Sequence, residues 1–199
     1  MSPVQSTIIF LGAPGSGKGT QSSRLSLELD VPCLSTGDAL RSEASRNTVA
    51  GSKLRQLLAS GSLASDELVC SIVGAQLRRK PRSILDGFPR NVKQARYLDS
   101  LVSSVTVIHL HVSRRTVLRR LAARRREDDV ESVVLRRYAE FERLSAPLIE
   151  YYRGPNYHRI DGDRDADAVA RDILQLCRPA VVGDRFIHAG VAFEQAHQF

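Results

Sequence analysis

A glycine-rich segment near the N-terminus constrains the fold of this chain more than any other feature. The apolar run Thr7–Leu11 is typical of a buried parallel strand. The sequence GAPGSGKGT follows it directly at residues 12–20, and a helix is predicted over Gly17–Asp30. A strand, a glycine-rich loop and a helix in this order are the setting of a phosphate-binding loop. We therefore predict that backbone N–H groups of the loop and of the helix N-terminus bind a polyphosphate.

One position of this loop departs from the strict pattern, which has Ser or Thr directly after the lysine. Here Gly19 follows Lys18, and Thr20 comes one residue later. We expect Lys18 to reach the β- and γ-phosphates, and a Mg²⁺ ion to be held through water rather than directly by the loop. Asp86 ends the strand-like segment Ser83–Asp86, and a carboxylate at that end of a parallel strand is suited to organise the metal.

Strand-like and helical segments alternate along the rest of the chain. Further strands are predicted over Val31–Leu34, Ser83–Asp86, Val105–Val112 and Tyr157–Ile160. Further helices are predicted over Gly37–Leu58 and Ser65–Arg79, with breaks near Gly51 and Gly61, and over Val92–Leu101, Ser113–Arg126, Val130–Tyr152 and Asp165–Arg178. Strands joined by crossover helices favour an α/β fold with a parallel sheet covered on both faces. We expect residues 1–178 to form this unit and residues 179–199 to be a tail of unknown role.

Composition is consistent with one globular domain in a reducing compartment. The 199 residues are 42% hydrophobic and 26% charged, enough to bury a core without a disulfide or metal. No apolar run approaches the roughly 18 residues of a membrane span, and the N-terminus lacks the basic region of a secretory signal. Cys33, Cys70 and Cys177 lack metal-ligand spacing, which indicates reduced thiols. We expect a cytoplasmic monomer that does not bind membranes, and an organelle matrix remains open.

The chain is basic, with a formal net charge of +7, and 25 of its 29 basic residues are arginine. Arginine binds phosphate groups in a bidentate fork, so the partners are expected to be nucleic acid or small phosphates. A compositional bias of the source genome is the alternative explanation for the overall count. Aromatic residues make up only 6% and tryptophan is missing, which disfavours base stacking on a nucleic acid, so we do not expect a nucleic-acid partner.

Further motifs follow the later strands. STGDALR spans Ser35–Arg41, DGFPR spans Asp86–Arg90 with Gln94 four residues on, and APLIEYY spans Ala146–Tyr152. RRREDD occupies residues 124–129, and Arg137 follows it. Together with residues 12–21, this set resembles the adenylate kinases of the nucleoside monophosphate kinase family, in order over residues 6–178. The resemblance implies a P-loop NTPase-type sheet with a small NMP-binding region at about residues 35–64 and a very short lid at about 124–130.

The resemblance also implies an activity, the reversible transfer of the terminal phosphoryl group of Mg-ATP to AMP, giving two ADP. It implies that ATP contacts Gly15, Ser16, Gly17, Lys18, Gly19, Thr20, Arg120, Arg124 and Arg164. It implies that AMP contacts Thr36, Arg41, Ser62, Leu63, Ala64, Gly87, Phe88, Pro89, Arg90, Gln94, Arg126 and Arg137. The implied catalytic residues are Lys18, Arg90, Arg124, Arg126 and Arg137, and Asp86 is the implied Mg²⁺ residue, acting through water. Because only Arg125 separates Arg124 from Arg126, the lid roles of these arginines are open, and a solvated charge run is the alternative.

Two other activities remain alternatives at this point. UMP and CMP kinases resemble this pattern, but usually have alanine where Thr36 stands and lack a glutamine corresponding to Gln94, so both residues favour AMP. A basic nucleotide-dependent RNA- or ribosome-associated factor on the same fold is the other alternative. His109 and His111 lie on a predicted buried strand and are interpreted as structural, because phosphoryl transfer depends on positioning and charge rather than on a histidine.

Overall fold

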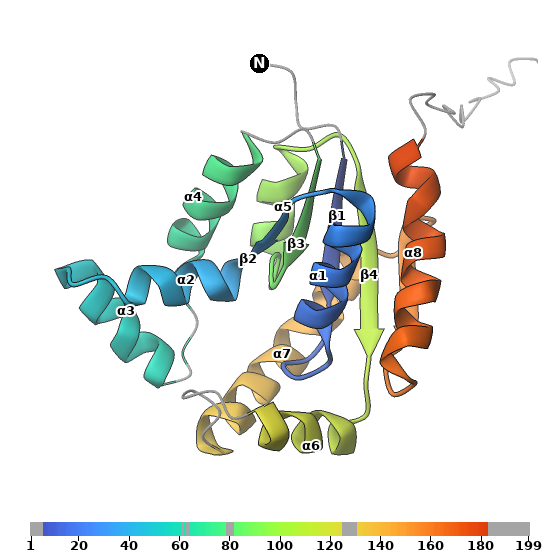
Figure 1. Cartoon of the computed structure of the whole chain (residues 1–199). Coiled ribbons are helices and arrows are strands. Elements are labelled where there is room, and N and C mark those ends of the chain that lie inside the picture. Colours follow the sequence, from blue (N-terminus) through green and yellow to red (C-terminus); the bar gives the residue numbers. More distant parts are fainter. Residues whose placement is uncertain (1–5, 61, 63, 79–81, 125–130, 183–199) are drawn as a thin grey trace, which may run out of the picture.

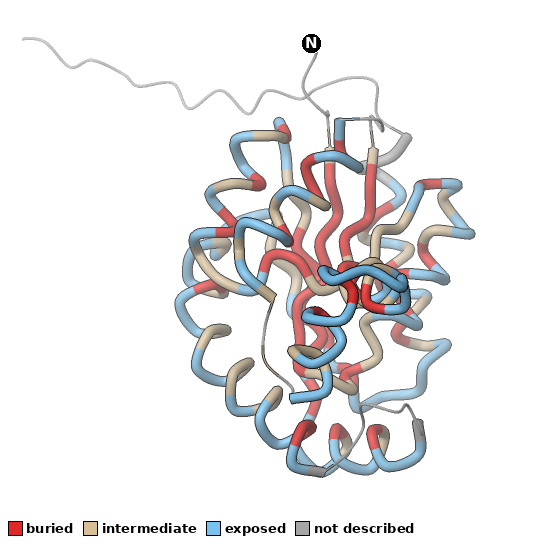
Figure 2. Tube along the Cα trace, turned by 90° about the vertical axis from the view of Figure 1, so that its left-hand side faces the viewer, coloured by how far each residue is buried: buried red, intermediate tan, exposed pale blue. Residues whose placement is uncertain are grey.

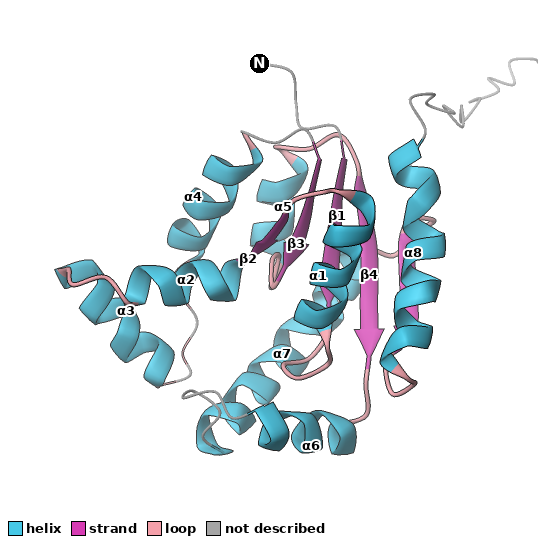
Figure 3. Cartoon of the chain, viewed as in Figure 1, coloured by secondary structure: helices cyan, strands magenta, loops and turns pink. Residues whose placement is uncertain are grey.

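The computed structural model describes residues 6–60, 62, 64–78, 82–124 and 131–182. Its five strands are β1 (Ser6–Leu11), β2 (Cys33–Ser35), β3 (Arg82–Asp86), β4 (Val105–His111) and β5 (Tyr157–Asp161). Its eight helices are α1 (Lys18–Leu29), α2 (Thr36–Ala44), α3 (Val49–Ala59), α4 (Asp66–Leu77), α5 (Val92–Asp99), α6 (Arg114–Arg124), α7 (Glu131–Tyr151) and α8 (Ala166–Val182). Strands and helices alternate as the sequence predicts (Figure 3).

The five strands form one parallel sheet in the order β2-β3-β1-β4-β5. The central strand β1 pairs with β3 on one side, where Ile8 faces Ile84, and with β4 on the other, where Ile8 faces Thr106. Figure 1 shows α1 and α8 on one face of the sheet and α5 and α7 behind it. The predicted α/β fold, a parallel sheet with helices on both faces, is confirmed.

Alternate residues of β1 supply the two halves of the core, because successive side chains of a strand point to opposite faces. Ile8 and Phe10 pack in one cluster with Leu25 of α1 and Ile173 of α8. Ile9 lies in the other cluster, which includes residues of α4, α5 and α7. Figure 2 shows this buried centre, with the exposed residues concentrated on the outer helices. The sheet therefore gives the loops at its carboxyl edge a rigid support.

The structure moves one predicted helix break. The chain leaves the helical conformation between α2 and α3, at residues 45–48, and not near Gly51. Thr48 begins α3, since its Oγ1 accepts a hydrogen bond from the backbone N–H of Gly51 at 3.0 Å. A Cβ atom at Gly51 would lie 2.4 Å from the carbonyl oxygen of Arg46. Gly51 thus permits a close approach of two backbones and does not interrupt a helix.

The last helix is longer than predicted. The sequence predicts a helix end at Arg178, but α8 continues through Pro179 to Val182. Val169, Ile173 and Cys177 recur at intervals of four and are buried in the core, so packing supports α8 over most of its length. None of the described helices is long and apolar enough to cross a membrane.

Candidate active site

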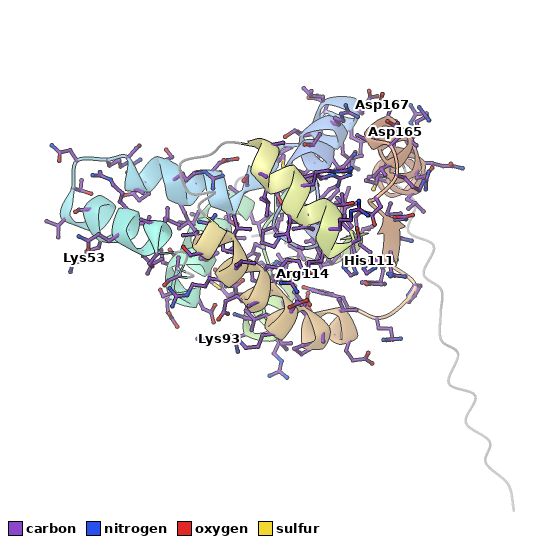
Figure 4. All side chains as sticks on the ribbon, turned by 90° about the horizontal axis from the view of Figure 1, so that it is seen from below. Lys53, Lys93, His111, Arg114, Asp165 and Asp167 are labelled. Atoms are coloured by element: carbon purple, nitrogen blue, oxygen red, sulfur yellow. The ribbon has the colours of Figure 1, made fainter. Side chains whose placement is uncertain are left out.

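A cavity of about 910 Å³ lies beyond the carboxyl ends of β1 and β3. Its lining comes from the glycine-rich loop after β1, from α1 and α2, from the segment after β3, and from α7. Ligands of open parallel sheets bind at this edge, next to the point where the strand order reverses. Figure 4 views the molecule from this edge, with Lys53 of α3 on the left, Arg114 of α6 near the middle and Asp165 near α8 on the right.

The glycine-rich loop wraps the start of α1. Gly17, the residue before the helix, has φ of +97°, a left-handed conformation that favours glycine, and it leaves the helix N-terminus without a side-chain cap. The Nζ group of Lys18 donates hydrogen bonds to the carbonyl oxygens of Gly12 at 2.7 Å and Ala13 at 2.8 Å. These two hydrogen bonds hold the ammonium group of Lys18 against the backbone of the glycine-rich loop. Backbone N–H groups at the start of α1, with the partial positive charge of the helix end, suit an anion there.

Three arginines from three different segments line the same cavity. They are Arg41 of α2, Arg90 after β3 and Arg137 of α7. Arg41 forms an ion pair with Asp38, one turn earlier in α2. The Nε of Arg90 donates a hydrogen bond to the carbonyl oxygen of Gly87 at 2.9 Å. Arg137 donates a hydrogen bond to the carbonyl oxygen of Leu58 at 3.3 Å.

The electrostatics of Arg90 indicate how this group of arginines behaves without a ligand. The guanidinium is reached by solvent in the cavity, yet protein atoms surround it, and this desolvation lowers the pKa of Arg90 from its ordinary value. The neighbouring charge of Asp86 acts in the opposite direction, whereas Arg137 and Arg41 lower the pKa further. Several positive charges that disfavour one another around a cavity form a site suited to a phosphate group.

Two more arginines line the cavity on the side of the glycine-rich loop. Arg120 of α6 donates to the carbonyl oxygen of Ser16 at 3.2 Å and to that of Gly162 at 2.9 Å. Arg164 forms an ion pair with Asp172 of α8 at 2.7 Å. Arg120 thus connects the loop to the segment after β5, so that both border one space.

A small second cavity of about 40 Å³ lies beside the first, with room for roughly one water molecule. Leu40, Ala64 and Arg90 border both cavities. Thr36 and Gln94 line the small one, and the buried amide of Gln94 accepts from the backbone N–H of Arg90 and donates to Asp66. The predicted AMP residues Thr36 and Gln94 are therefore adjacent to the large cavity, with their polar groups bonded within the protein.

The two histidines of β4 differ. His109 is buried as predicted, and its Nδ1 shares a hydrogen bond with the hydroxyl of Tyr157. Burial lowers the pKa of His109 to about 4, and the charges of His111, Arg159 and Lys18 act in the same direction. The expectation that His111 is also buried is wrong, because it is the last residue of β4 and points to solvent. His109 also contributes to the lining of the large cavity.

Most of the predicted site residues gather around the large cavity. Those that line it are Gly15, Ser16, Gly17, Lys18, Gly19, Thr20, Arg41, Ser62, Ala64, Asp86, Gly87, Pro89, Arg90, Arg120, Arg137 and Arg164. The side chain of Phe88 is fully buried in the core and lines neither cavity, so only its backbone is available. Leu63, Arg126 and the side chain of Arg124 lie outside the described part of the chain, as does most of the predicted lid.

One wall of the cavity was missed by the sequence reasoning. Phe141, Leu144 and Leu148 of α7 keep the helical spacing of a core face, and Leu148 and Phe141 do pack in the core, but all three also line the cavity. Arg137 lies on the same stripe, four residues before Phe141. Arg137 is predicted to bind phosphate, and it lies on the same helix face as these apolar residues. This shared face is the signal in the sequence that could have identified them as cavity-lining.

Comparison with known proteins agrees with this arrangement. The family model described as adenylate kinase matches residues 10–157. The chain is 38% identical over 181 residues to "Adenylate kinase 1" of Synechocystis sp. (strain ATCC 27184 / PCC 6803 / Kazusa), covering 86% of this chain and 97% of that protein. It is 33% identical over 214 aligned positions to an adenylate kinase of Pseudothermotoga lettingae, covering 87% and 99%, respectively. With a phosphate-binding loop and an arginine-lined cavity at the expected edge of its sheet, the chain belongs to the adenylate kinase family.

Proposed function

We propose that this enzyme transfers the terminal phosphoryl group of Mg-ATP to AMP and so forms two ADP. The observation that carries this proposal is the shared cavity, which is lined both by the glycine-rich loop and by Arg41, Arg90 and Arg137. A polyphosphate on the loop and a monophosphate on the arginines would meet within it. The family match and the names of the relatives favour this reaction over the alternatives of a pyrimidine monophosphate kinase and an RNA-associated factor.

The chemistry requires position and positive charge. In the transfer, a phosphate oxygen of AMP forms a bond to the γ-phosphorus of ATP, and the bond from that phosphorus to the β-γ bridging oxygen breaks. Negative charge is spread over the transferred group, so fixed cations stabilise the transition state without a general base. Lys18 and the helix N-terminus would hold the donor, while Arg90 and Arg137 would hold the acceptor and the transferring group. Arg124 and Arg126 of the predicted lid would complete this charge and exclude water.

The residues beside the loop fit a Mg²⁺ ion held mainly by substrate. Asp86 Oδ2 lies 3.3 Å from the position that a Cβ atom of Gly19 would occupy, so its carboxylate borders the loop where the strict pattern has a hydroxyl. Among the described residues no group of three or more His, Cys, Asp or Glu side chains could hold a metal alone. Mg²⁺ commonly keeps several waters and combines one carboxylate with substrate phosphates. Asp86 and Thr20 would hold it through water, and the bound ion would neutralise phosphate charge.

A coupled assay of ADP formation tests the proposal. ATP is supplied with AMP, UMP, CMP or GMP, with and without Mg²⁺, and turnover is expected with AMP only in the presence of the ion. A diadenosine polyphosphate should inhibit competitively against both substrates, because it can occupy both ends of the cavity. Preferred turnover of UMP or CMP would refute the choice of acceptor, and strong salt-dependent binding of RNA without kinase turnover would favour the RNA-associated factor.

We also propose that the enzyme works as a monomer in the cytoplasm. Light scattering after size-exclusion chromatography tests this expectation, since a mass near 22.0 kDa is expected for the active species.

A further inference from the structure

We propose that Asp66 is a positioning residue that makes the site select a 6-aminopurine over a 6-oxopurine, by fixing the orientation of the Gln94 side-chain amide. This inference rests on the proposed function, in which Gln94 contacts the base of AMP. Asp66 belongs to α4 and Gln94 to α5, which begin close together at the small cavity.

The partners of Gln94 permit only one orientation of its amide. Its Oε1 accepts a hydrogen bond from the backbone N–H of Arg90 at 2.8 Å, and its Nε2 donates to Asp66 Oδ1 at 2.7 Å. A backbone N–H can only donate and a carboxylate can only accept. Turning the amide by 180° would place its NH₂ against the N–H group and its oxygen against the carboxylate, so both hydrogen bonds would become repulsive contacts.

Asp66 is itself held in place. It is the first residue of α4, and its side chain is 24% exposed. Its Oδ1 also accepts from the Nδ2 of Asn91 at 3.0 Å, and its Oδ2 lies 3.9 Å from the Nζ of Lys93, which Figure 4 labels. Asn91 in turn caps α5 by accepting from the backbone N–H of Gln94 at 2.9 Å. The carboxylate is therefore a fixed acceptor that connects the starts of two helices.

The fixed amide has hydrogen-bonding capacity left for a base. A glutamine amide carries two N–H donors and two acceptor lone pairs, and the described partners use one of each. The remaining donor matches the N1 acceptor of a 6-aminopurine, and the remaining lone pair matches its exocyclic NH₂. A 6-oxopurine presents the opposite arrangement, an N1–H donor and an O6 acceptor, which only the reversed amide would match.

The small cavity places this amide next to the nucleotide site. The small cavity is lined by Gln94 together with Thr36, Leu40 and Ala64. Of these residues, Leu40 and Ala64 also border the large cavity. At about 40 Å³ the space is smaller than a purine, so Thr36 and Leu40 of α2 must move outward when a base enters. Such a movement leaves the contact between Asp66 and Gln94 intact, because neither residue belongs to α2 or α3.

The test compares kcat and KM for AMP and IMP in four proteins: the wild type, Asp66→Ala, Asp66→Asn and Glu67→Ala. We expect Asp66→Ala to lower the preference for AMP over IMP, measured as the ratio of kcat/KM values, by about tenfold. The change should appear in KM, with kcat at saturating AMP altered by less than about twofold. Asp66→Asn should restore the preference, because its amide oxygen can still accept from Gln94.

Glu67→Ala is the matched control. Glu67 is the next residue in the same helical turn, but it pairs with Lys93 at 2.9 Å and is not bonded to Gln94. Glu67→Ala therefore reports the effect of removing a first-turn carboxylate and its ion pair without a contact to Gln94, and its preference for AMP over IMP should equal that of the wild type. If Asp66→Ala folds poorly, Asp66→Ser keeps a small polar residue at the helix start while its hydroxyl is too short to reach Gln94, and the same loss is expected.

Three results would overturn the inference. One is an unchanged ratio in Asp66→Ala or Asp66→Ser, even with a lowered melting temperature, since that would make the contact merely structural. Another is an equal loss in Glu67→Ala, and a third is a wild type that does not prefer AMP to IMP. A wild type without turnover of AMP would instead refute the proposed function, so the two failures can be told apart.

Discussion

Replacing Arg90 by methionine should separate the binding of AMP from the stability of the fold. Arg90 lines the large cavity with Arg41 and Arg137, and its Nε bonds the carbonyl oxygen of Gly87 at 2.9 Å. Desolvation and the two neighbouring arginines lower the pKa of Arg90, which means that its charge is less favourable in the free enzyme than in water, although Asp86 acts in the opposite direction. A bound phosphate group would favour the charged form of Arg90, because it supplies an anion that pairs with the guanidinium.

The size of the effect follows from the loss of one charged partner. Truncating one member of a hydrogen-bonded charge pair in a desolvated site costs about 2–5 kcal/mol. Because solvent reaches Arg90, the lower half of this range applies, which is about 30- to 300-fold in affinity. We expect the KM for AMP to rise by about this factor in Arg90→Met, while the KM for ATP changes by less than about twofold. The melting temperature should stay level or rise slightly, since a repelling neighbour of Arg41 and Arg137 is removed.

Steady-state kinetics with each substrate varied in turn, together with thermal unfolding followed by circular dichroism, check this prediction. The control is Arg96→Met, because Arg96 is an exposed arginine of α5 that does not line the cavity. An equal rise in both KM values, or a large fall in melting temperature without a change in KM, would refute the assignment of Arg90 to the acceptor phosphate.

Three more predictions concern other parts of the site. Lys18→Ala should lower kcat by about two to three orders of magnitude and leave the fold intact by circular dichroism; retained turnover would contradict the role of the loop. Gln94→Ala should raise the KM for AMP far more than the KM for ATP, and equal increases would argue against its contact with the base. The depressed pKa of His109, about 4 against an ordinary 6.5, means that the unfolded chain binds more protons between these values. Stability should therefore fall by up to about 3 kcal/mol from pH 6.5 to 4. Urea titrations should show this loss in the wild type but not in His109→Gln.

Local chemistry explains which parts of the fold could be predicted from the sequence. The glycine-rich loop lies between a strand and a helix that adjoin it along the chain, so neighbouring residues suffice to predict it. The alternation of strands and helices predicts the parallel sheet for the same reason. The sequence predicts a helix break near Gly51, because glycine disfavours helices. Its close approach to the backbone of Arg46 depends instead on how α3 packs against the preceding turn, which the local sequence does not reveal.

Features that depend on contacts between distant segments could not be predicted. The stripe of α7 with Phe141 and Leu144 has the spacing of a core face, and only the packing of α7 in the fold brings it to the same cavity as the glycine-rich loop. The resemblance assigns Gln94 to AMP, but the carboxylate that orients it is 28 residues away. Asp66 by itself resembles an ordinary acidic residue in the first turn of a helix.

The polar groups of the site are already bonded within the protein, and this determines how the site can discriminate. Lys18 bonds carbonyl oxygens of its own loop, Arg41 pairs with Asp38, and Gln94 bonds Arg90 and Asp66. A ligand that takes over a contact of Lys18 or Arg41 would gain only the difference between two hydrogen-bonding arrangements, so in the proposed site these cations would accept any suitably placed phosphate. Gln94 differs, because a base can use its remaining donor and acceptor without breaking either existing bond. If Gln94 contacts the base as proposed, specificity for the base would depend on keeping its amide fixed, whereas binding of phosphate would depend on cations that exchange their partners.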